Sequence, residues 1–219
     1  MSKSRASFLK SAASAEEVAL ALHSADEQAL HEEDVSWVRW TFQSIRARRP
    51  AIVFETEAME RAELIEDWKR FVEQTWLPSI APLLLRGWAA AREGREEELF
   101  LVNAKMGAAL SPEEQERSVI AGQMLLRATQ GAKYQSTLGA FRRYVEQTGA
   151  APQLAGVWAA LAALFQLPPA DVLIEHLREE WLVATKHCAH HEPPQGPVSF
   201  SGLAARALHE QRHFQFQQE

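Results

Sequence analysis

The feature that most constrains the fold is an uncharged stretch, residues 147–170, in a chain that is otherwise rich in charge. Prolines bound it, with Pro152 near its start and Pro168-Pro169 at its end, and residues 153–167 between them are mostly Ala, Leu, Trp and Phe. A helix that is apolar on every side must be surrounded by protein or by lipid. This one is shorter than the roughly 20 residues that cross a bilayer. We therefore predict a central helix enclosed by other helices.

Helical signals recur along the rest of the chain, whereas strand signals are almost absent. The clearest helix start is Ser111-Pro112-Glu113-Glu114, which combines an N-cap serine, a first-turn proline and a glutamate at the third helical position. The sequence predicts an all-α, single-domain helical bundle of about nine or ten helices around the central apolar helix. Its predicted parts are N-terminal helices in 1–55, a bundle core in 56–191, a proline-rich hinge in 192–197 and a C-terminal arm in 198–219.

Composition agrees with one soluble globular domain. The chain has 219 residues, 47% of them hydrophobic and 24% charged, and a net charge of -6 that argues against nucleic-acid binding. The single cysteine, Cys188, excludes an internal disulfide. The first residues lack the apolar run of a signal peptide, so we expect a cytoplasmic protein that does not enter a membrane.

Aromatic and acidic residues follow the helical periodicity. Four tryptophans lie in apolar stripes and are expected in the core: Trp68, Trp76, Trp158 and Trp181. Trp37 and Trp40 are the better candidates for a partner-binding surface. The paired carboxylates Glu113-Glu114 and Glu179-Glu180 are expected on solvated helix starts and faces.

Histidines near the predicted hinge form one candidate metal site. His187, His190 and His191 cluster there, and two imidazoles one helical turn apart can bind a metal such as nickel or zinc. The alternative is a polar helix end without a metal. Cys188 falls on the apolar stripe of the same helix and is expected to be a buried, inert thiol.

A second candidate lies in the C-terminal arm. His209, Glu210 and His213 fit the His-Glu-x-x-His pattern, in which two imidazoles bind zinc and the glutamate acts as general base. A catalytic zinc also needs a third protein ligand, and only six residues follow His213. A zinc-dependent hydrolase therefore stays an alternative beside a chance match.

Several segments together resemble the urease accessory protein F family. The helix Ala81-Pro82-Leu83-Leu84-Leu85-Arg86-Gly87-Trp88 is similar to that family's proline-leucine helix with its tryptophan. Glu116-Arg117-Ser118, followed by Gly122 and Leu125-Leu126, resembles its next motif, and the segment after Pro168-Pro169 resembles its last. Residues 1–55 diverge from the family pattern.

The resemblance implies an all-α accessory protein that is not an enzyme. It implies a homodimeric scaffold that binds a partner accessory protein and a nickel GTPase and helps to insert nickel into apo-urease, with nickel in transit and no tightly bound cofactor. The arm offers apolar residues for such a partner, because a segment of its size is not expected to bury an apolar face alone. These residues are Phe200, Leu203, Leu208 and Phe214. A maturation chaperone for another metalloenzyme, of the molybdenum oxidoreductase type, is the other alternative.

Overall fold

The computed structural model describes residues 61–129, 136–185 and 193–216. Over these residues every regular element is helical, which confirms the predicted all-α class. Two predicted helices, in 14–30 and 34–50, lie outside the described residues. Trp37, Trp40 and the 187–191 histidine cluster also lie outside them.

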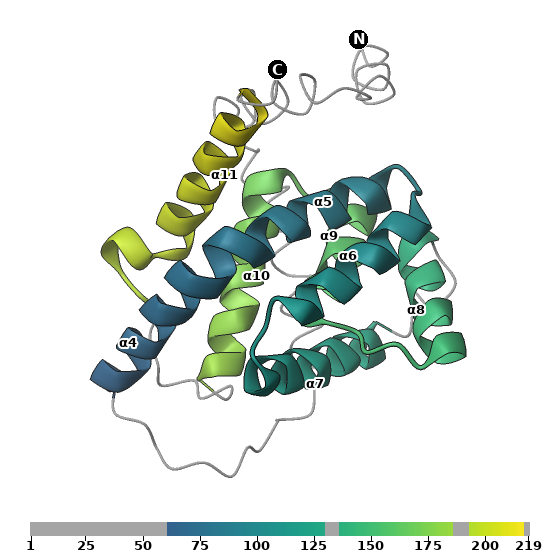
Figure 1. Cartoon of the computed structure of the whole chain (residues 1–219), viewed down its shortest axis with the longest axis horizontal. Helices are drawn as coiled ribbons and strands as arrows, with labels where there is room; N and C mark the ends of the chain where they lie inside the picture. Colours follow the sequence, from purple (N-terminus) through teal and green to yellow (C-terminus); the bar gives the residue numbers. More distant parts are fainter. Residues whose placement is uncertain (1–60, 130–135, 186–192, 217–219) are drawn as a thin grey trace.

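The helices follow one another with short connections (Figure 1). Their bounds are α4 Arg61–Phe71, η1 Val72–Ile80, α5 Ala81–Arg92, α6 Glu96–Ala108, α7 Pro112–Ala128, α8 Ser136–Thr148, α9 Leu154–Leu164, α10 Pro169–Ala184, η3 Gly196–Val198 and α11 Phe200–Phe216. Since α4, η1 and α5 are continuous and η3 is a single 3-10 turn, the described residues form seven separate helices. The predicted nine or ten are not confirmed by this part of the chain.

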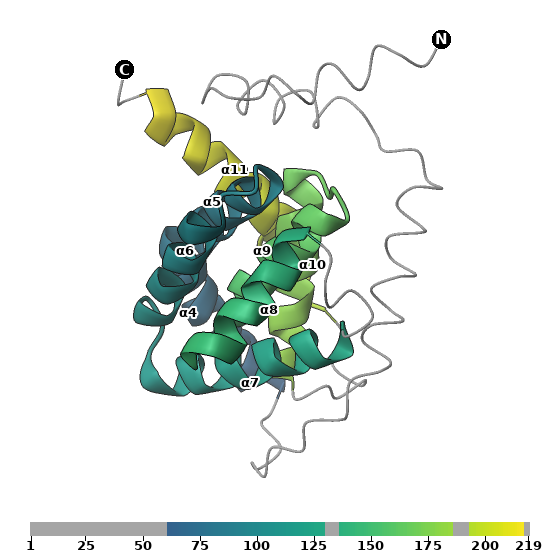
Figure 2. The same cartoon turned by 90° about the vertical axis from the view of Figure 1, so that its right-hand side faces the viewer.

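The apolar helix α9 lies in the middle of the bundle, as predicted. It contacts α5, α6, α7, α8 and α10, which surround it on different sides (Figures 1 and 2). Every side chain from Leu154 to Ala162 is buried, including Trp158, whose indole N–H donates to the Val172 carbonyl at 3.0 Å. Enclosure by five helices explains why this segment needs no polar face.

Small and polar residues set how closely α9 approaches its neighbours. A Cβ atom on Gly122 of α7 would lie 2.2 Å from the Pro152 carbonyl oxygen, so only glycine allows this approach. Ser118, one turn earlier, accepts a hydrogen bond from the backbone N–H of Leu154 at 3.0 Å. Asn103 of α6 accepts from the N–H of Gln153 at 2.9 Å. The start of α9, which has no side-chain cap of its own, is therefore capped by neighbouring helices.

The segment 61–92 forms one continuous rod, although Pro78 and Pro82 lie within it. Between Val72 and Ile80 the helix widens to π geometry, and the N–H of Ala81 donates to the Trp76 carbonyl five residues earlier. A proline clashes with the carbonyl four residues before it in an α-helix, and the wider turn accommodates Pro78. Pro82 falls in the first turn of α5, where its missing N–H disrupts nothing.

The described part of the predicted C-terminal arm is α11, which packs on the bundle. Phe200, Leu203 and Leu208 are buried, and the Phe200 ring lies 6.2 Å from the Trp68 ring. The helix mainly contacts α10. The segment does not bury its apolar face alone, since α4 and α10 provide the surface that covers it; its binding to a partner stays a prediction.

Candidate functional site

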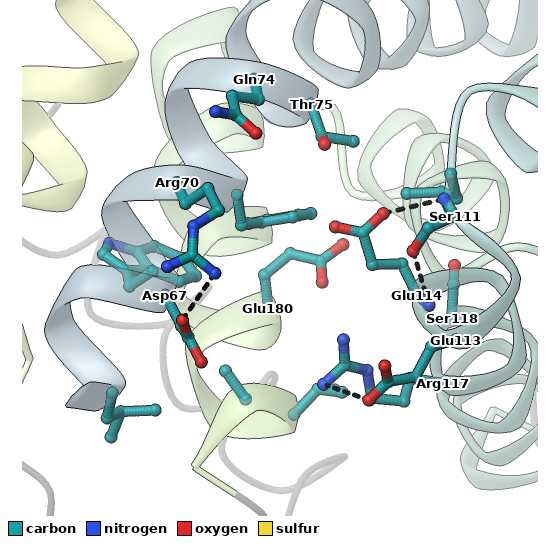
Figure 3. Close-up of a pocket in the computed structure, with 16 residues that line it drawn as sticks. Asp67, Arg70, Gln74, Thr75, Ser111, Glu113, Glu114, Arg117, Ser118 and Glu180 are labelled. Atoms are coloured by element: carbon teal, nitrogen blue, oxygen red, sulfur yellow. Dashed lines mark hydrogen bonds and ion pairs between the residues drawn. The ribbon is translucent and has the colours of Figure 1, made fainter. Parts of the chain in front are cut away.

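A pocket of about 350 Å³ opens where the α4–η1 rod, the start of α7 and the end of α10 meet (Figure 3). The rod contributes Gln74 and Thr75 from its π segment, and α10 contributes Glu180. Pockets of a few hundred Å³ accommodate small ligands or single side chains. The π turns also lie at this pocket, and such turns are frequent at functional sites.

Carboxylates outnumber cations in the pocket wall. The acidic lining residues are Asp67, Glu113, Glu114 and Glu180, and the basic ones are Arg70 and Arg117. Arg70 pairs with Asp67 at 3.0 Å, and Arg117 lies 3.8 Å from Glu113. Two carboxylates remain, and both point into the same space in Figure 3.

Glu114 has one structural partner. Its carboxylate accepts from the backbone N–H of Ser111 at 2.8 Å, and the Ser111 hydroxyl accepts from the N–H of Glu114 at 3.3 Å. This reciprocal pair is the capping box that the sequence predicted for α7. It fixes the Glu114 side chain at the edge of the pocket.

Glu180 lies deeper and is linked to the core. His176, one turn earlier on α10, is fully buried, and its Nε2 lies 3.3 Å from a Glu180 carboxylate oxygen. The indole N–H of Trp76 donates to His176 Nδ1 at 3.2 Å. Since Nδ1 accepts, the single proton of the neutral imidazole is on Nε2. His176 Nε2 makes no hydrogen bond, although the Glu180 carboxyl group lies within 3.3 Å.

Burial keeps both His176 and Glu180 uncharged at neutral pH. The pKa of Glu180 is raised to about 8, chiefly by burial and also by the charges of Glu179 and Glu114, against the attraction of Arg117. Burial lowers the pKa of His176 to about 3, against the attraction of Glu179. The contact between His176 and Glu180 therefore joins a neutral imidazole to a carboxylic acid, and it is not an ion pair.

The expectation that Glu179-Glu180 lies on a solvated face is wrong. Glu179 is fully buried, and the Glu180 side chain is only 15% exposed. The apolar stripe of α10 was predicted correctly, since Leu173, Leu177 and Trp181 are buried. The carboxylates are buried as well because α10 is covered on more than one side, by α4, α5, α9 and α11. A single stripe of hydrophobic residues in the sequence does not reveal that the other faces of the helix are covered too.

Of the three His-Glu-x-x-His residues, the structure describes the side chains of His209 and Glu210. His209 is exposed, and Glu210 accepts a hydrogen bond from Arg206 at 2.8 Å, which occupies the carboxylate that would act as base. The side chain of His213 lies outside the described residues. Over the part of the chain that the structure describes, no three His, Cys, Asp or Glu residues are grouped to hold a metal ion.

The other predicted site residues divide into two groups. His187, His190, His191, Trp37, Trp40 and the Phe214 side chain lie outside the described residues, so their roles stay predictions. Phe200, Leu203 and Leu208 are covered by the chain itself. A partner would contact these three only if α11 moved away from α10.

Helices in the described ranges are all too short or too polar to cross a membrane. The fold thus defines an all-α protein with a pocket at the meeting point of three helices. A family model for UreF matches residues 59–181, which is more than half of the chain and extends from the start of the rod through most of α10. The chain belongs to the UreF family, a family of urease accessory proteins. Among curated proteins and among solved structures, none matches the chain.

Proposed function

We propose that this protein is a scaffold for nickel insertion into urease. In this proposal it binds a partner accessory protein and a nickel GTPase, acts as a homodimer in the cytoplasm, and handles nickel as cargo without a resident metal. The observation that supports it is the UreF match over 59–181, because that segment includes α9 and the helices that enclose it. An accessory role of this kind needs binding surfaces and no catalytic group of its own.

Complementation provides the main test. The chain is expressed in cells that carry the other urease genes but lack their own UreF, together with the nickel GTPase and accessory protein of its own genome. We expect restored urease activity and co-purification of both partners. Failure of complementation together with recovery of a different metalloenzyme client would contradict the proposal and would favour the molybdenum-type alternative.

Two sets of residues outside the described part of the chain can be tested in the same assay. His187, His190 and His191 are proposed to contact nickel in transit, and their joint replacement by alanine should lower urease activation without preventing partner binding. Trp37→Ala with Trp40→Ala should instead weaken partner binding. The matched control for the histidine variant is His23→Ala, which should leave activation unchanged.

A further inference from the structure

Helix α6 has one buried and one exposed face. Its inner face, with Leu99, Val102 and Met106, is fully buried among α5, α8 and α9. The opposite face lies at the surface of the bundle (Figures 1 and 2). The exposed residues that form this outer face follow helical spacing: Glu97, Leu101, Ala104, Lys105 and Ala108. Leu101 lies at its centre and, at 51%, is the one large hydrophobic side chain of the described residues that is exposed.

An aromatic pair extends the apolar surface beside Leu101. Phe100 of α6 stacks on Tyr144 of α8, with ring centroids 4.1 Å apart and an interplanar angle of 4°. Both side chains are only half-buried, so part of the stacked pair is open to water. A single exposed leucine is ordinary on a protein surface, whereas a leucine beside partly exposed aromatic rings is typical of a contact with another protein.

The charges of the outer face are arranged symmetrically about Leu101. Glu97 lies four residues before it and Lys105 four residues after it, and neither forms an ion pair with another described residue. Eight residues of helix separate them by roughly 12 Å, so they do not pair within one chain. If two copies of α6 lie antiparallel, Glu97 of each copy is level with Lys105 of the other, and Leu101 meets Leu101. A parallel pair would instead place Glu97 level with Glu97.

We infer that the outer face of α6 is the contact between two copies of this chain, with the two α6 helices antiparallel and a twofold axis at Leu101. The inference rests on the homodimer of the proposed function and assigns its surface. A twofold axis makes each contact occur twice, so one ion pair per chain counts double. The small side chains of Ala104 and Ala108 let the second helix approach closely. One helix pair with flanking aromatic rings is a small interface, so we expect a dissociation constant in the micromolar range.

Exchange of the two charges tests the pairing. Glu97→Lys alone places lysine against Lys105 of the other copy, and Lys105→Glu alone places glutamate against Glu97. Each variant should therefore dimerise about tenfold more weakly than the wild type, or weaker still. Mixed in equal amounts, the two variants bring opposite charges together at both positions and should form a heterodimer about as stable as the wild-type dimer. Glu63→Lys, at an exposed position of α4, is the matched control and should dimerise like the wild type.

The apolar centre of the contact is tested separately. Leu101→Ala should weaken the dimer about tenfold or more, because the leucine is lost from both copies. High salt should weaken the wild-type dimer by screening the two ion pairs. Association is measured by sedimentation equilibrium of the full chain from about 1 μM to about 500 μM. A thermal melt of each variant confirms that it folds, as expected for substitutions at exposed positions.

The outcomes separate this inference from the proposed function. A chain that is monomeric throughout the range, whose outer face then serves a different protein or none, overturns both the inference and the homodimer. A dimer that the α6 variants leave unchanged overturns the inference alone, since the copies then meet through another surface. Failure of the two charge variants to recover when mixed also overturns it. Restored urease activity in the complementation assay is a separate readout, so nickel insertion can be confirmed even where the assigned surface is wrong.

Discussion

At the scale of single residues, Glu180 and His176 depart furthest from ordinary behaviour. Each is held in its uncharged form by burial, and the two shifts have opposite effects on stability. Between pH 4.5 and 8 the folded chain retains a proton on Glu180 that the unfolded chain has lost. Between pH 3 and 6.5 the unfolded chain has a proton on the His176 imidazole that the folded chain lacks. The two effects offset each other between pH 4.5 and 6.5, so stability should fall as pH rises from 6.5 to 8 and as it drops from 4.5 toward 3.

Glu180→Gln tests the upper half of this profile. The substitution removes the titrating carboxyl and keeps its shape, so the loss of stability between pH 6.5 and 8 should disappear. One proton contributes at most about 1.4 kcal/mol per pH unit. Urea unfolding of the two proteins at pH 6.5, 7.5 and 8.5 measures the difference. Parallel profiles for wild type and variant would show that Glu180 is ionised in the folded state already at neutral pH.

Gly122 is a residue whose role follows from contact distance alone. In Gly122→Ala the new Cβ would meet the Pro152 carbonyl oxygen at 2.2 Å, and backbone on both sides leaves little room to shift. Overpacking of this kind costs roughly 1–3 kcal/mol, and we expect the upper end. Chemical denaturation measures it, with Glu116→Ala on the exposed side of α7 as control. A loss below about 0.5 kcal/mol would show that α7 and α9 can move apart.

At the scale of elements, the sequence predicted best those helices whose ends carry their own signals. The capping box of α7 is such a local signal, and it was placed correctly. Gly149, which follows α8 at φ +69°, is another local signal. The continuity of the α4–η1–α5 rod could not be predicted in this way, because proline normally ends a helix and the π turns that accommodate Pro78 have no local sequence signal. Trp76 holds this widened segment against His176 through a contact distant in sequence.

The end of α9 offers a stabilising substitution. Gln166 has a positive φ of 54°, and the N–H of Leu167 donates back to the Ala162 carbonyl at 3.0 Å. This is the left-handed helix end at which glycine is usual. Gln166 is exposed, so Gln166→Gly relieves the strained φ without loss of packing and should raise the free energy of unfolding by about 0.5–1 kcal/mol. Gln166→Ala is the control and should give no gain; equal effects of both substitutions would contradict the assignment to backbone conformation.

Two residues of α11 allow the apolar and ionic contributions to its attachment to be compared. Leu203 is 1% exposed, whereas Arg206 is 48% exposed and reaches Glu73 of the rod at 2.5 Å. Leu203→Ala should cost about 2–5 kcal/mol, and Arg206→Ala should cost less than about 1 kcal/mol. Unfolding measured by tryptophan fluorescence compares the two variants, and Trp68, which packs against Phe200 of α11, is one reporter. If Leu203→Ala costs as little as Arg206→Ala, the helix is only loosely held and is available to a partner.

At the scale of the whole molecule, the site and the core differ in how far sequence could predict them. The core depends on one apolar segment that can be recognised directly in the sequence, and α9 lies within the predicted residues 153–167. The pocket depends on residues near positions 70, 114 and 180, which only the folded chain brings together. Glu114 was recognised as a helix cap and Glu180 as a surface charge, and neither assignment could reveal that they face each other. Two helices of the pocket wall, α7 and α10, nevertheless also enclose α9.

Because five helices contact α9, damage to its centre should unfold the described bundle as one unit. Ala159 is fully buried, with 0% of its surface exposed to solvent, whereas Ala163, one turn later, is half-buried. Ala159→Glu places an unpaired charge in the core and should cost several kcal/mol, a large part of the roughly 5–15 kcal/mol that stabilises a typical domain. Ala163→Glu can direct its carboxylate toward water and should cost much less. Circular dichroism and tryptophan fluorescence should report the same single transition, shifted strongly by the first substitution only. A transition that splits in Ala159→Glu, with part of the helical signal retained, would mean that some of the surrounding helices hold together without α9 at their centre.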